Sequence, residues 1–311
     1  MSSIPATAPA LADYRRILRR RWILVACLVA VILLSILADF TLGPSGLGLG
    51  ELGHALWHPS EADPTTRVIV WDIRLPYALM AVAVGLALGL AGAEMQTILN
   101  NPLASPFTLG ISSAAAFGAS LALLLNLSLP GIPQSWMVAT NAFGFALLSA
   151  MLLDAVARWG AMSTSGLVLF GIALVFSFNA AVSLVQFVAS AEALQGLVFW
   201  TLGSLSRFGS DVSRLRLTAL LRISILAALA VSFVGIIGFV GLVAPHIARR
   251  LFGEDHRFYL PGSALVGGVI LSAASIASKN IVPGIIIPVC IVTSLVCVPF
   301  FLTVVLLRQI R

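Results

Sequence analysis

Long runs of apolar residues alternate with short charged clusters along this chain. Eight runs each approach the ~20 residues that a helix needs to cross a bilayer: 22–40, 75–97, 108–126, 137–157, 165–190, 215–237, 259–278 and 283–307. The runs are continuous, whereas a transmembrane β-barrel alternates apolar and polar positions. The pattern therefore predicts an all-α polytopic membrane protein.

Two further apolar pieces, 193–205 and 239–251, are shorter than the others. At 1.5 Å per residue, each makes a helix of roughly 20 Å, which falls short of the ~30 Å hydrocarbon core. Such a piece can cross the bilayer only where neighbouring protein shields its ends. We expect about ten membrane segments, or nine if 193–205 does not cross.

Composition and charge agree with this prediction. Hydrophobic residues make up 59% of the 311 residues and charged residues only 10%, which leaves too little polar surface for a water-exposed globule. The net charge of +6 does not indicate nucleic-acid binding, because the basic residues gather at the ends of apolar runs, where the positive-inside rule explains them. We expect a cytoplasmic basic tail over 1–21 and a single transmembrane domain over 22–311.

Residues that carry chemistry are scarce. The chain has no G-x-x-x-x-G-K-[ST], H-E-x-x-H, C-x-x-C or G-x-S-x-G motif, so we expect no enzyme activity. Glu94, Asp154 and Arg158 lie near predicted helix ends and form no relay through the spans. This argues against a proton-driven transporter without excluding one.

Small residues recur at three- and four-residue spacing, as at Gly85, Gly89 and Gly92. Such faces let helices approach closely. Simple packing is the favoured interpretation, and sliding of these faces during transport is the alternative.

Two long motifs carry a family resemblance. The first runs from 71 to 119 and contains Arg74-Leu75-Pro76, Asn101-Pro102-Leu103-Ala104 and Leu109-Gly110-Ile111-Ser112-Ser113. The second is GFVGLVAPHIAR, from Gly238 through Gly241, Pro245 and His246 to Arg249, followed by Asp255-His256-Arg257. Both resemble the permease subunits of the iron–siderophore, haem and cobalamin ABC importers.

The resemblance implies a cobalamin-permease-like helix bundle in the bacterial inner membrane that forms the translocation path for ferric siderophores, haem or cobalamin. It implies no cofactor for this chain, because ATP would be bound by separate ATPase subunits. The other implied partners are a periplasmic or lipoprotein substrate-binding protein, a second permease copy or paralogue, and membrane lipid. The rival hypotheses are an ion-coupled secondary transporter and a truncated, non-transporting membrane subunit.

Each motif also has a physical interpretation. Pro76 is tolerated in the first turn of a helix, and Arg74 before it can reach the headgroups. Asn101-Pro102 ends the preceding span, and Asn101 can bond backbone groups that the break frees. Pro245 interrupts its short helix, and His246 has a structural role in preference to a metal-ligand role.

The segment 249–257 is expected at the cytoplasmic face. By the positive-inside rule its arginines face the cytoplasm, and His256 among them is expected to be solvated. The candidate ATPase contacts are Arg249, Arg250, Asp255, His256 and Arg257.

One departure from the family concerns the region after Leu205. The family has another span there, followed by the main ATPase-docking loop, and roughly forty residues are missing from this chain. Arg207, Arg214, Arg216 and Arg222 indicate that the junction is cytoplasmic. A cytoplasmic junction requires either that 193–205 crosses the membrane or that one half of the chain is inverted relative to the family topology. Because the main docking loop is missing, coupling of this chain to an ATPase is left open. A second departure is Ser275, which replaces an aspartate common in the family.

Overall fold

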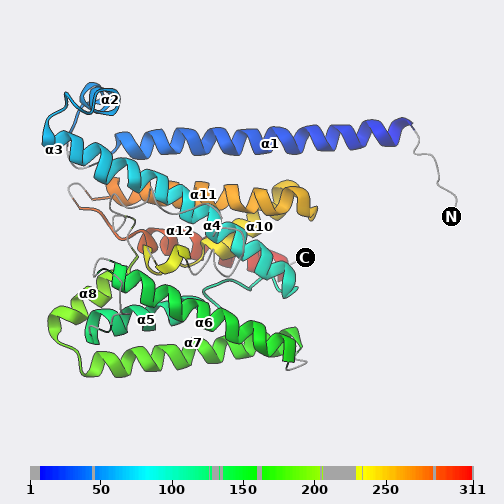
Figure 1. Ribbon diagram of the computed structural model, residues 1–311. Coiled ribbons are helices and arrows are strands. Elements are labelled where there is room, and N and C mark those ends of the chain that lie inside the picture. The colour runs from blue at the N-terminus through cyan, green and yellow to red at the C-terminus, as the bar shows by residue number, and fades with distance from the viewer. Residues whose placement is uncertain are drawn as a thin grey trace.

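The computed structural model describes residues 8–43, 46–125, 127, 133, 136–159, 163–203, 205, 229–232, 234–282 and 285–309, and this part of the chain is almost entirely helical. The long helices run roughly parallel or antiparallel to α1 (Ala8–Thr41), which forms one side of the molecule (Figure 1). The start of α1 and the end of α12 (Val289–Gln309) lie at the same end of the bundle (Figure 1). We term this the inner end, because α1 carries Arg15–Arg21 there, and the opposite end the outer end.

Five helical stretches in the described part are long and apolar enough to cross a bilayer: Asp13–Thr41, Pro64–Ile98, Met137–Ala157, Thr164–Phe187 and His256–Asn280. Two shorter apolar stretches are Ile111–Leu125 and Val289–Phe300. These helices coincide with predicted runs, so the prediction of an all-α polytopic membrane protein is confirmed. Most of the run 215–237 (residues 215–228 and 233) lies outside the described part of the chain. The number of membrane crossings therefore stays a prediction.

The first helix is longer than its apolar run. α1 has 34 residues and therefore a length of about 51 Å, well beyond the ~30 Å hydrocarbon core. It begins at Ala8, so the basic residues assigned to the tail are helical from there on. The inner end of α1 projects beyond the other helices (Figure 1).

One group of helices packs around α4 (Leu75–Ile98) and α11 (His256–Asn280), and it includes α1, α10 (Val240–Phe252) and α12. Gly85 and Gly89 of α4 lie against the backbone of Gly267 and Ser263 of α11, so closely that an added methyl group would collide with it. Gly92 lies in the same way against Gly241 of α10. The glycine spacing therefore serves close packing, as the favoured interpretation predicts.

The second group contains α5 (Ile111–Leu125), α6 (Met137–Trp159), α7 (Thr164–Phe187) and α8 (Ala191–Thr201). Gly118 of α5 meets the backbone of Asn141 in α6, and Phe117 meets Phe145 edge to face at 5.0 Å. α7 lies on the other side of α5 and is covered over only 11% of its most apolar stretch. Most of its surface therefore faces lipid or another chain.

The short apolar piece at 193–205 forms only an 11-residue helix, α8. At 1.5 Å per residue it is about 16 Å long, and it lies near the outer end (Figure 1). A helix of this length does not cross the bilayer by itself. Beyond it, Gly203 meets the backbone of Ile236, so the chain after α8 lies beside the chain that precedes α10.

Three short elements follow α1 at the outer end: α2 (Leu49–Trp57), α3 (Pro64–Arg67) and the π-helical turn η1 (Val68–Arg74), which leads into α4. Asp63 caps α3 by accepting the Thr65 N–H at 3.1 Å, and Pro64 stands in its first turn. The described part of the segment between α1 and α4 is therefore largely helical.

Candidate functional site

The outer end of α1 is tied to the start of α4 by Arg74. Its guanidinium Nη1 donates to the carbonyl oxygens of Phe40 at 3.1 Å and Thr41 at 2.9 Å, and the residue is only 5% exposed. These carbonyls belong to the last turn of α1, where backbone acceptors lack partners within the helix and a cation is favoured. The expectation that Arg74 reaches the headgroups is therefore wrong, because the end of α1 takes up its donors.

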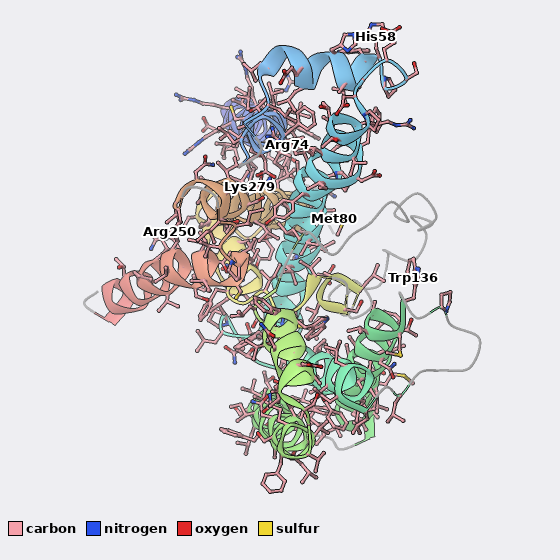
Figure 2. The ribbon with its side chains drawn as sticks, turned by 90° about the vertical axis from the view of Figure 1, so that its left-hand side faces the viewer. His58, Arg74, Met80, Trp136, Arg250 and Lys279 are labelled. Atoms are coloured by element: carbon pink, nitrogen blue, oxygen red, sulfur yellow. The ribbon has the colours of Figure 1, made fainter. Side chains whose placement is uncertain are left out.

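The π-helical turn η1 places Arg74 at the entry to α4. η1 ends at Arg74 and α4 begins at Leu75, so Pro76 lies in the first turn of α4 but not at a free helix start. Widened turns and prolines both redirect a helix. Figure 2, a view from the outer end, shows Arg74 and Lys279 near each other between α1 and α11.

A buried ion pair lies close to this contact between Arg74 and the end of α1. Nζ of Lys279 in α11 is 3.0 Å from Oδ1 of Asp39 in α1, and the side chains are 5% and 0% exposed. Ser275 Oγ donates to both carboxylate oxygens of Asp39, at 2.9 and 3.0 Å. Lys279 also donates to the Asp39 carbonyl at 3.2 Å and lies 4.1 Å from the centre of the Tyr77 ring. The charges are thus neutralised and hydrogen-bonded, as burial within a membrane span requires.

Sequence reasoning missed this pair. Asp39 falls in the last turn of one apolar run and Lys279 just after another, so each resembles an ordinary residue at a helix end. The available signal was the opposite charge of two residues near the same predicted membrane face. The pair joins positions 240 residues apart, and no local pattern specifies it.

The turn between α4 and α5 matches its motif. Asn101 Oδ1 accepts the N–H of Leu103 at 2.9 Å, so Asn101 binds backbone freed by the break, and this prediction is confirmed. Pro102 follows in the turn. Gly110 ends the turn at φ +86°, where a Cβ would lie 2.9 Å from that of Leu174 in α7. Ser112 is buried at 1% exposure in the first turn of α5.

The second motif forms the entry to α10. Gly238 is followed by Phe239 at φ +66°, an unfavourable angle for a bulky residue, and α10 begins at the next position. Phe239 stacks on Phe107 of the α4–α5 turn, with ring centres 6.4 Å apart. Gly241 lies so close to α4 that a Cβ added to it would be 3.0 Å from the Leu88 carbonyl oxygen. The motif thus brings α10 against the turn that carries the first motif.

Pro245 lies inside α10, where its ring removes one backbone donor. Gln96 of α4 donates its Nε2 to the Leu242 carbonyl of α10 at 3.3 Å, so a neighbouring helix contributes a donor. His246 is half-buried on α10. Among the described residues, no three His, Cys, Asp or Glu side chains gather in a way that could hold a metal ion.

The candidate ATPase contacts lie at the inner corner between α10 and α11. Asp255 caps α11 by accepting the Arg257 N–H at 3.2 Å, and it pairs with Arg21 of α1 at 2.6 Å. Arg249 donates to the Tyr259 hydroxyl at 3.2 Å. Asp255 and Arg249 therefore serve contacts within the chain. The other three candidates, Arg250, His256 and Arg257, are exposed.

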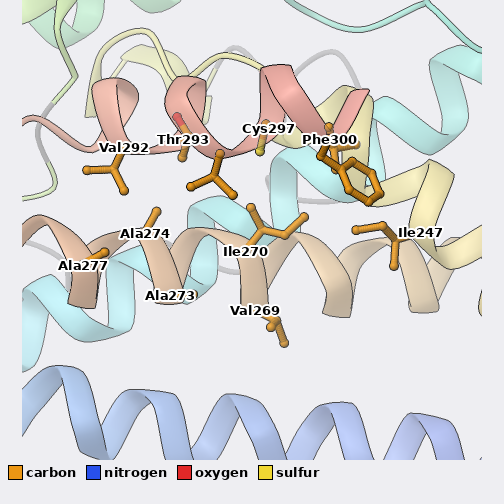
Figure 3. Close-up of a pocket in the computed structure, with 12 residues that line it drawn as sticks. Ile247, Val269, Ile270, Ala273, Ala274, Ala277, Val292, Thr293, Cys297 and Phe300 are labelled. Atoms are coloured by element: carbon orange, nitrogen blue, oxygen red, sulfur yellow. The ribbon is translucent and has the colours of Figure 1, made fainter. Parts of the chain in front are cut away.

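An apolar cavity of about 440 Å³ lies between α10, α11 and α12 (Figure 3). Ile270, Val292 and Phe300 are among its twelve lining residues, and Thr293 is the one that carries a hydroxyl. That hydroxyl donates to the Cys290 carbonyl at 3.0 Å. The cavity therefore offers few hydrogen-bonding groups to a polar metal chelate.

The bundle of membrane-spanning helices, broken at the α4–α5 turn and at Pro245 of α10, has the architecture of a membrane permease. The profile of the FecCD transport family matches residues 27–208 and 205–308. The chain belongs to the FecCD transport family.

Known proteins agree with this assignment. The hemin transport system permease protein HmuU of Yersinia pestis is 32% identical over 89% of this chain and 95% of its own. The Fe(3+)-citrate import system permease protein YfmE of Bacillus subtilis is 30% identical over 90% and 94%. A solved metal-chelate type ABC transporter in an inward-facing conformation has a TM-score of 0.74 and 25% identity, covering 91% of this chain and 98% of that one.

The family match is divided into two segments that meet at residues 205–208. This is the point at which the sequence comparison indicates a missing span and docking loop. The basic residues of the junction, from Arg207 to Arg222, lie outside the described part of the chain.

Proposed function

We propose that this chain is the permease subunit of a binding-protein-dependent ABC importer for metal chelates, with ferric siderophores as the substrate class. The observation that carries the proposal is the FecCD match over nearly the whole chain on a membrane-spanning helix bundle. Relatives named for hemin and Fe(3+)-citrate import support an iron chelate as the substrate.

The chain would supply the path, and other subunits would supply the energy. It contains no Gly-rich phosphate loop of its own, so ATP binding falls to separate ATPase subunits at the inner end. Substrate capture falls to a substrate-binding protein at the outer end. The sparsely covered α7 supports a second permease copy or paralogue as the neighbour that completes the path.

The inner corner is the proposed ATPase contact. Arg250, His256 and Arg257 are exposed at the inner end, where an ATPase would bind. Arg249 and Asp255 would support this contact indirectly, because they hold the corner together through Tyr259 and Arg21. An acidic patch on the ATPase would complement these arginines.

The missing span and docking loop are what a truncated, non-transporting subunit would show, and the assembly experiment below separates that alternative from the proposal. The ion-coupled alternative has no observation in its favour among the described residues. An ion-coupled transporter would place ionisable groups near the middle of the membrane. The buried pair described above, Asp39 and Lys279, lies at the outer end instead, and each charge is compensated by the other.

Co-purification tests the proposal. The chain would be expressed with the ATPase and the substrate-binding protein encoded beside it, solubilised, and isolated by a tag on the permease alone. We expect both partners to be retained, and the binding protein to bind a ferric siderophore. A permease that folds but retains no ATPase would contradict the proposed function.

A further inference from the structure

The short helix α2 has an exposed apolar face that neither the fold nor the proposed transport function uses. α2 lies beside the outer end of α1, on the side of α1 that faces away from the bundle (Figure 1). Seen from the outer end, it lies at the edge of the molecule, far from the α5–α8 helices (Figure 2). In both views its axis runs crosswise to α1. A helix in this position is parallel to the membrane plane.

The residues of α2 divide into three faces. Leu52 and Ala55, each 1% exposed, pack with Phe40 and Val70 and fix the helix to the protein. Leu49 and Trp57, eight positions apart, are 71% and 80% exposed and follow one apolar stripe. The polar residues Glu51 and His54 occupy the remaining side.

The helix is also held firmly. The Gly48 N–H donates to the Glu51 carboxylate at 3.0 Å and closes the first turn. The indole of Trp71 in η1 donates to the Ala55 carbonyl at 3.0 Å. The orientation of the exposed faces is thus set by the protein before any partner binds.

We propose that α2 is an interfacial anchor, whose Leu49–Trp57 face inserts among lipid headgroups and upper acyl chains while Glu51 and His54 face water. A helix with one apolar face and one polar face that lies in the membrane plane is the form that binds this interface. Tryptophan is enriched there because its ring is apolar and its N–H is polar.

The lipid partner is favoured by continuity with the surface of α1. Leu33, Leu34 and Leu37 in the outer half of α1 are 62%, 65% and 59% exposed on a membrane-spanning helix, so this part of the molecule faces acyl chains. α2 packs on Phe40, one turn further along. α2 therefore adjoins this lipid-facing surface at the point where the apolar run of α1 ends.

Site-directed spin labelling in lipid nanodiscs tests the proposal with the full chain. Single cysteines would replace Leu49 or Trp57 on the apolar face, and His54 on the polar face as the matched control, after substitution of the three native cysteines. Collisions with oxygen report lipid, and collisions with a water-soluble nickel chelate report water.

We expect labels at 49 and 57 to favour oxygen and the label at 54 to favour nickel. Equal nickel accessibility at all three positions would overturn the proposal. It would also be overturned if labels at 49 and 57 were exposed to water until a substrate-binding protein covered them. All three positions are exposed, so we expect the labelled chains to fold as the wild type does, and thermal unfolding of each chain checks this.

Discussion

Neutralising one member of the Asp39–Lys279 pair should destabilise the protein far more than neutralising both. Asp39→Asn keeps the shape of the side chain and an acceptor for Ser275, but it removes the charge that faces Lys279. Lys279→Met keeps much of the side-chain length and leaves the Asp39 carboxylate with Ser275 as its remaining neutral donor.

The structure sets the magnitude. At the observed 3.0 Å, and with an effective dielectric constant of about 20, the Coulomb attraction is roughly 5–6 kcal/mol before desolvation. Removing one partner of a buried pair generally costs about 3–5 kcal/mol. Asp39→Asn should lower the free energy of unfolding by about 3 kcal/mol, at the low end of this range. Lys279 keeps its hydrogen bond to the backbone carbonyl of residue 39 and its contact with the Tyr77 ring. That cost is about a hundredfold in the unfolding equilibrium.

Lys279→Met should cost at least as much, about 3–5 kcal/mol, since the buried carboxylate then loses its ion-pair partner. The double variant Asp39→Asn with Lys279→Met buries no charge, and we expect it to lose about 1 kcal/mol or less. The two substitutions therefore couple by more than about 2 kcal/mol in a double-mutant cycle.

Reversible unfolding in mixed detergent micelles, followed by circular dichroism, measures these free energies for the wild type and three variants. Ser275→Ala serves as a control that removes a hydrogen bond but no charge, and it should cost about 1.5–3 kcal/mol, because the lost bond goes to a charged group. The reasoning would be refuted by single variants within about 0.5 kcal/mol of wild type, or by a double variant whose loss equals the sum of the single losses.

Three further predictions concern the contact between α4 and α11, the contact of Arg74 with the end of α1, which we term the clamp, and the inner corner between α10 and α11. Gly85→Ala should lower the thermal unfolding midpoint, because the new methyl group meets the backbone of α11, whereas Gly144→Ala, with open space around it, should leave the midpoint unchanged or raise it. Arg74→Met should cost about 2–3 kcal/mol in the same micelle assay, since two buried carbonyls lose a charged donor; a loss below about 0.5 kcal/mol would contradict the clamp. Arg250→Glu should reduce co-purification of the ATPase without changing the unfolding midpoint, while Arg249→Glu should lower both because it also loses Tyr259; normal assembly of both variants with altered substrate selectivity would contradict the contact.

Much of the fold follows from patterns that act locally. Continuous apolar runs predict the spans because a bilayer leaves a helix as the simplest way to pair every backbone group. Gly85 and Gly89 predict a close helix contact, and α11 provides it. Asn101 predicts its own bond to Leu103, because a side chain so near the backbone has few other partners.

The features that sequence reasoning missed depend on which helices become neighbours. Asp39 and Lys279 meet only because α1 and α11 pack with a particular rotation and depth. Arg74 points to the end of α1 rather than toward the headgroups, because the carbonyls of Phe40 and Thr41 accept its donors. The apolar pattern of the sequence does not predict helix α2 between the first two spans, since its two buried residues, Leu52 and Ala55, form too short a pattern.

ATP-dependent uptake into proteoliposomes tests the central claim most directly. The chain would be reconstituted with its ATPase, with the substrate-binding protein and a radiolabelled ferric siderophore outside and ATP inside. We predict accumulation that requires ATP, the binding protein and this chain together, and that is lost when the ATPase carries an inactivated nucleotide site. Accumulation driven by an ion gradient without any ATPase, or no accumulation from a fully assembled complex, would contradict the account.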